Sequence, residues 1–83
     1  MPRVPSPIRP LVLASLENGD GTRCVDIFRR GDGTFGFEEC RRDPEDPRGW
    51  SRMDAFGHLV FATETAARRA AAAAVAWLAA RKT

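Results

Sequence analysis

The chain has 83 residues, of which 43% are hydrophobic and 29% are charged, and its 13 basic and 11 acidic residues leave a net charge of +2. This length accommodates one small domain, and the near balance of charge argues against a disordered tail or a strongly basic nucleic-acid arm. Composition by itself indicates no chemistry.

The first ten residues contain four of the six prolines. Proline fixes the backbone φ angle and donates no hydrogen bond, so residues 1–10 are predicted to be a flexible arm ahead of a single domain over 11–83. A polyproline segment that binds a partner is the alternative. The apolar stretch 70–80 is shorter than the roughly 20 residues of a membrane span, and 11–16 is too short for a signal peptide. Together with the preference for arginine over lysine, these features favour a bacterial cytoplasmic protein.

One tetrapeptide occurs twice, as Gly19-Asp20-Gly21-Thr22 and again as Gly31-Asp32-Gly33-Thr34. Gly-Asp-Gly suits a three-residue hairpin loop, because its second glycine can take the left-handed backbone conformation without strain. Each copy lies between runs of apolar or β-branched residues. The repeat therefore predicts two hairpins and a three-stranded antiparallel β-meander.

The turns also predict the strand register, with Asn18 closing against Thr22 and Arg30 closing against Thr34. Side chains alternate between the two faces of a sheet, so this register sorts them. The predicted core face carries Leu11, Leu13, Val25, Ile27, Phe35 and Phe37. The opposite face is mixed and carries Val12, Ala14, Leu16, Cys24, Asp26, Phe28, Glu38 and Cys40.

The second half of the chain predicts a loop and then a helix. Two Asp-Pro steps indicate a loop over 41–50, from which Trp50 and Met53 can fold back on the sheet edge. Residues 57–62 have the composition of a fourth short strand. Thr63 is a good N-cap for a helix that is expected to continue to about Arg81, where Arg81 and Lys82 complement the helix dipole. Its predicted contact stripe is Ala67, Ala71, Ala74 and Leu78. The expected fold class is α+β: a β-meander packed by one C-terminal α-helix.

No constellation of residues points to catalysis, and we expect the protein not to be an enzyme. His58 is the only histidine and has no recognisable partner, and no phosphate- or dinucleotide-binding motif is present. Two cysteines and one histidine are too few for a zinc site of ordinary spacing, so no metal or cofactor site is predicted. The register places Cys24 opposite Cys40, where a non-hydrogen-bonded position would allow either two reduced thiols or a disulfide.

The expected function is a non-enzymatic protein-interaction module, whose partner is a second copy of the chain or an unidentified protein. The alternative is weak nucleic-acid binding through the hairpin and loop arginines, although their alternation between faces breaks up a continuous basic patch. The candidate partner-binding residues are Val12, Leu16, Phe28, Arg30, Arg42 and Arg48.

The run from Gly36 to Asp46 (GFEECRRDPED), followed by Gly49-Trp50 and by Trp77-Leu78 in an alanine-rich helix, resembles a set of short bacterial proteins of unknown function. The resemblance covers about residues 22–80 and implies no functional residues, because that family has no assigned activity. The predicted order of three strands and a helix is also similar to the partial double-stranded-RNA-binding fold of some bacterial antitoxins. In that fold a basic helix N-terminus grips RNA, whereas residues 63–65 are neutral to acidic here.

Overall fold

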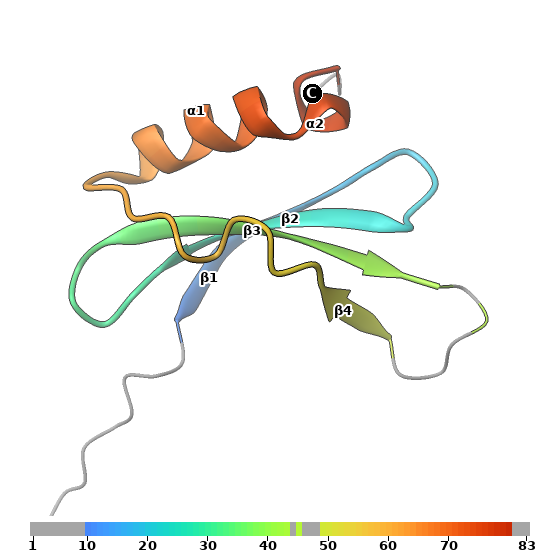
Figure 1. Ribbon diagram of the computed structural model, residues 1–83, viewed down its shortest axis with the longest axis horizontal. Helices are drawn as coiled ribbons and strands as arrows, with labels where there is room; N and C mark the ends of the chain where they lie inside the picture. The colour runs from blue at the N-terminus through green and yellow to red at the C-terminus, as the bar shows by residue number, and fades with distance from the viewer. Residues whose placement is uncertain (1–9, 44, 46–48, 81–83) are drawn as a thin grey trace, which may run out of the picture.

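The computed structural model describes residues 10–43, 45 and 49–80. They form an α+β fold in which an antiparallel sheet is covered on one face by C-terminal helices (Figure 1). The strands follow chain order across the sheet, which confirms the predicted meander. The elements are β1 (Leu11–Glu17), β2 (Arg23–Arg29), β3 (Phe35–Arg42), β4 (Trp50–Arg52), α1 (Glu64–Ala74) and α2 (Ala76–Ala80). The predicted arm over residues 1–10 lies, apart from Pro10, outside the described residues.

The second Gly-Asp-Gly-Thr turn produces the register predicted for β2 and β3. Arg30 N–H donates to the carbonyl of Thr34, and Gly33 N–H donates to the carbonyl of Arg30. Gly33 has a φ of 90°, the left-handed conformation expected for it. The two strands then pair without a slip over their whole length.

The first turn closes one residue later than predicted. Asn18 N–H donates to the carbonyl of Arg23 and not to that of Thr22. The side-chain oxygen of Asn18 accepts the N–H groups of both Thr22 and Arg23, at 3.0 Å each, and so holds the wider loop. The pairing of β1 with β2 is therefore shifted by one residue, until a β-bulge between Val12 and Ala14 restores the predicted register.

The shift changes which face several β1 side chains occupy, because a slip of one residue exchanges the faces of a strand. The prediction that Ala14 and Leu16 face away from the helix is wrong, since Ala14 pairs with the core residue Ile27 and Leu16 pairs with Val25. Leu11 and Leu13, which are predicted core residues, also lie outside the core.

The fourth strand lies at Trp50–Arg52 and not at 57–62. It pairs with the C-terminal end of β3, so the expectation that Trp50 folds back on the sheet edge is confirmed. In the segment 57–62, Phe61 makes only a single bridge, to Phe35.

The carboxylate of Glu38 holds the chain just before and at the start of 57–62. It accepts the backbone N–H groups of Ala55, Phe56 and Gly57 at 3.2, 3.4 and 2.6 Å. These donors are held by a side chain, so the chain curves around Glu38 before it returns to the β3 edge at Phe61.

Thr63 caps α1 as predicted, with its hydroxyl oxygen accepting the N–H of Ala66 at 3.0 Å. The prediction of one continuous helix is wrong, because Val75 has φ −110° and ψ 102° and divides it into α1 and α2. The residues expected to compensate the helix C-terminus, 81–82, lie outside the described part of the chain.

The break is accompanied by a contact that joins α2 to the sheet. The Trp77 indole N–H donates to the Glu39 carboxylate at 2.8 Å, and Arg23 forms an ion pair with the same oxygen at 3.2 Å. Glu39 is buried, and a buried carboxylate is costly without such partners. The extended conformation at Val75 redirects the chain before Trp77, and Val75 itself is buried in the core.

The core lies between the helices and the β2–β3 pair. Phe37 is fully buried and stacks on Phe56 at a ring-centroid distance of 5.0 Å, and Phe35 packs at the margin of the same cluster. Both side chains thus face the helix as predicted. Ala67 and Ala71 of α1 and Val75 at the helix break lie in this core, whereas Ala74 of the predicted stripe is exposed. Alanines at the contact allow the helix to approach the sheet closely.

Candidate functional site

The free edge of the sheet at β1 presents an apolar surface. Leu11, Val12 and Leu13 are 62%, 49% and 37% exposed, and among the residues that the structure describes β1 has a neighbouring strand on only one side. Asn18 is bonded to Arg23, so the alternation of an antiparallel ladder directs the peptide groups of Ser15 and Glu17 away from β2. An edge with free peptide groups and apolar side chains is a template for pairing with another strand.

The three predicted apolar partner-binding residues are separated by the structure. Val12 lies on the exposed β1 edge, whereas Leu16 is half-buried on the helix side. Phe28 is only 9% exposed, although it lies on the face away from the helix. Its ring passes over Gly36, where an added Cβ would come within 2.8 Å of the ring carbons. Val12 alone of the three is therefore well placed for a partner.

Arg30 is used inside the molecule. Its guanidinium lies over the Phe28 ring at 5.0 Å from the centroid and donates to the carbonyls of Gly57 at 2.7 Å and Leu59 at 3.0 Å. It also donates to the carbonyl of Phe35. With these bonds Arg30 fastens the segment after β4 to the β2–β3 hairpin, a role that sequence spacing did not suggest.

Of the two other predicted arginines, only Arg42 is among the described residues. Arg42 stacks on the Trp50 ring at 4.7 Å and donates to the carbonyl of Gly21 at 3.0 Å. Arg48 lies outside the described residues. A hollow of about 270 Å³ at this end of the sheet is lined by Thr22, Arg23, Arg41, Arg42 and Asp43.

Cys24 lies directly opposite Cys40, as predicted, and both are buried free thiols. The next pair along the ladder is joined by a hydrogen bond from Arg42 N–H to the carbonyl of Thr22, so two-residue alternation makes Cys24–Cys40 a hydrogen-bonded pair as well. The pair is therefore not at the non-hydrogen-bonded position that would bring the two side chains closest together. The Cβ atoms of a hydrogen-bonded pair lie toward the wide end of a range of about 4.5–5.5 Å, beyond the ~3.5–4.5 Å of a disulfide. The backbone thus favours two thiols.

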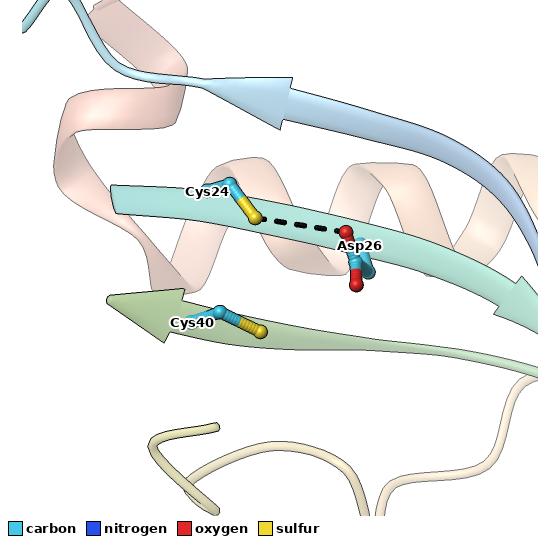
Figure 2. A group of neighbouring side chains, drawn as sticks. All are labelled: Cys24, Asp26 and Cys40. Atoms are coloured by element: carbon cyan, nitrogen blue, oxygen red, sulfur yellow. Dashed lines mark hydrogen bonds between the residues drawn. The ribbon is translucent and has the colours of Figure 1, made fainter. Parts of the chain in front are cut away.

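Asp26 joins the two cysteines on the face away from the helix (Figure 2). Its carboxylate accepts the Cys24 thiol at 3.6 Å and the Ser15 hydroxyl at 2.7 Å. One donor atom from each of Cys24, Asp26 and Cys40 lies within 4.8 Å of the other two. Sequence reasoning placed all three on one face but missed Asp26 as a member of the cluster. The signal was available as a Cys-x-Asp step on a strand.

Burial and the neighbouring Asp26 raise the pKa of the Cys24 thiol to about 12. Burial also raises the pKa of Cys40, again with a contribution from Asp26. Both thiols are consequently protonated at neutral pH, and a protonated thiol is a poor nucleophile. The cluster can hold protons or a cation, but it is not arranged for nucleophilic attack.

His58 is exposed in the segment after β4. Across the described ranges, no helix combines the length and the apolar character that crossing a membrane requires. Comparison with protein-family models, with curated proteins and with solved structures gives no match to this chain. Functional inference therefore depends on the geometry described above.

Proposed function

We propose that this chain is a non-enzymatic protein-interaction module of the bacterial cytoplasm that pairs with a second copy of itself through β1. The observation that carries the proposal is the exposed apolar run Leu11–Leu13 on a sheet edge. When a second strand is added, the exposed apolar side chains are buried and the free peptide groups form hydrogen bonds.

The opposite edge of the sheet supports the choice of β1. There, β4 is only three residues long, and Met53 N–H and the Phe61 bridge continue along β3 beyond it. Short and covered edges are the usual protection against unwanted strand pairing. The seven-residue β1 has no such cover among the described residues.

The side chains of β1 favour a second copy as the occupant. Its sequence, LVLASLE, contains a single charged residue, Glu17, so no oppositely charged partner is required. Two identical apolar strands can pair antiparallel about a two-fold axis, which closes the assembly at a dimer.

Sedimentation equilibrium over a range of concentrations tests this proposal. We expect a monomer–dimer equilibrium whose dissociation constant rises roughly tenfold or more in Val12→Lys, because a lysine on an edge strand opposes pairing. Val60→Lys is the matched control, since Val60 is a similarly exposed valine (63%) remote in sequence from β1. A monomer at every concentration, or an equal effect of the two variants, would contradict the proposal.

Amide exchange gives a second readout at residue resolution. The N–H groups of Ser15 and Glu17 are expected to exchange more slowly as the concentration rises, because pairing across the β1 edge replaces water with a protein acceptor. Unchanged rates at these two residues in a protein that does dimerise would place the interface elsewhere.

Weak nucleic-acid binding is a second candidate function, and the arginine-lined hollow favours it. Arg23 is paired with Glu39 and Arg42 is stacked on Trp50, so Arg41 is the most available cation there. A mobility assay with RNA at two salt concentrations should show binding that weakens steeply with salt and is reduced in Arg41→Ala. Absence of any shift at low salt would eliminate this function.

A further inference from the structure

The cluster of Cys24, Asp26 and Cys40 has the features of a cation site that is independent of the proposed β1 interface. Cys24 and Asp26 project from β2 on the same face, and Cys40 lies opposite Cys24 on β3 (Figure 2). In this part of the sheet, β2 and β3 each have a hydrogen-bonded strand on both sides, so the backbone that carries the three side chains is rigid. We propose that Cys24, Asp26 and Cys40 form a three-ligand site for a thiophilic divalent cation such as zinc.

The distances suit that chemistry. A tetrahedral zinc ion with zinc–sulfur bonds of about 2.3 Å holds its sulfur atoms roughly 3.8 Å apart. The three donor atoms already lie within 4.8 Å of one another, so small side-chain rotations suffice to bring them around one ion. Three protein ligands leave the fourth position for a water molecule, as in open zinc sites.

The donor types select the kind of metal. Two thiolates favour zinc or copper(I) over magnesium or calcium, and the additional carboxylate oxygen suits a divalent ion of borderline softness. Binding replaces the two thiol protons, which are released to solvent, by one dication. The three ligands, with one negative charge each, and the dication together carry a net charge of −1.

Neighbouring residues fit this arrangement. The Ser15 hydroxyl donates to Asp26 at 2.7 Å and orients the carboxylate from the adjacent strand. Arg52 stands opposite Cys40 on β4 and supplies a positive charge beside the site. The backbone geometry of the Cys24–Cys40 pair is unfavourable for a disulfide, which leaves both sulfur atoms available as ligands.

Cobalt(II) titration of the reduced full-length chain tests the proposal, because thiolate ligation produces an intense charge-transfer absorption. We expect one cobalt per chain, displaced by zinc. Cys24→Ser and Cys40→Ser should each lose most of the absorption. Asp26→Asn should weaken cobalt affinity roughly tenfold or more while keeping the absorption, because both thiolates remain.

Glu17→Gln is the matched control. Glu17 stands opposite Cys24 on β1 but is not one of the three donors, so this variant removes the same charge and should bind cobalt like the parent chain. Far-UV circular dichroism checks that each variant is folded, and Asp26→Asn keeps the test decisive if a cysteine variant is not. The proposal is overturned by the absence of thiolate absorption, by equal affinities of Asp26→Asn and Glu17→Gln, or by one cobalt per two chains.

Discussion

The two turns of the meander have the same four residues and different structures. The turn over 31–34 closes between Arg30 and Thr34, whereas the turn over 19–22 closes between Asn18 and Arg23. In both, the aspartate accepts the N–H and the hydroxyl of the threonine two residues later. The two turns differ in the residue that precedes the repeat.

Asn18 and Arg30 occupy that position. The short side chain of Asn18 turns back on its own loop and accepts two backbone N–H groups. The long side chain of Arg30 also reaches Gly57 and Leu59 beyond the loop, and its backbone closes the turn directly. An identical turn motif can thus produce two registers, because a flanking side chain decides which backbone groups remain to be paired.

The largest expected effect follows from removing Arg30. Arg30→Ala leaves the carbonyls of Gly57 and Leu59 without this donor and uncovers the Phe28 ring, so the free energy of unfolding should fall by about 2–4 kcal/mol. Urea denaturation measures it, and Arg30→Lys should recover only part of the loss because a single ammonium cannot reproduce the fork. A loss below about 1 kcal/mol would show that these bonds contribute little.

Asn18→Ala should have a smaller effect, because its bonds stay within one loop. The N–H of Arg23 loses its acceptor and the N–H of Thr22 keeps only its bond to Asp20, so we expect a loss of about 1–2 kcal/mol in the free energy of unfolding. Asn18→Asp keeps the acceptor oxygen and should remain within about 0.5 kcal/mol of the parent chain. Equal losses in the two variants would contradict the role assigned to that oxygen.

The second glycine of each turn should be equally sensitive to substitution. Gly21 and Gly33 have φ of 73° and 90°, so Gly21→Ala and Gly33→Ala should each cost about 1 kcal/mol of unfolding free energy. Gly19 lies outside the left-handed region and has open space around it, which makes Gly19→Ala the control with little effect. Thermal denaturation compares the three, and a large loss in the control would refute the conformational explanation.

The smallest effect concerns acid titration of the two aspartates. The threonine hydroxyl two residues on holds the pKa of Asp20 and of Asp32 below the ordinary value of 3.8. A pKa that is lower in the folded state than in the unfolded chain stabilises the protein at pH values above the unfolded-state pKa. This contribution is lost as the pH falls through the folded-state pKa.

Thr22→Val and Thr34→Val should therefore each raise the pKa of the aspartate two residues earlier, by similar amounts. Carboxyl NMR titration measures the shifts by following Asp20 and Asp32 in the parent chain, Asp20 in Thr22→Val and Asp32 in Thr34→Val. A shift at only one turn would show that the two aspartates are not held alike.

The candidate sites were partly visible in the sequence. The exact pairing of β2 with β3 follows from one turn, so the apposition of Cys24 and Cys40 and the position of Asp26 on their face could be predicted. The exposed edge at Leu11–Leu13 could not, because it depends on the bulge that follows the wider first turn. Arg30 was expected to face a partner, yet carbonyls almost thirty residues away bind it.

The amino-acid sequence by itself determined the positions of the turns, the alternation of β2 and β3 and the start of the helix at Thr63. These features depend on backbone preferences and hydrogen bonds within a few residues. Tertiary structure decided the course of residues 53–61 around Glu38. The helix is interrupted at Val75, and beyond this break the Trp77 indole donates to Glu39, a contact between distant parts of the sequence. A buried carboxylate must be satisfied by whatever donors the fold brings near it, and local sequence does not specify those donors.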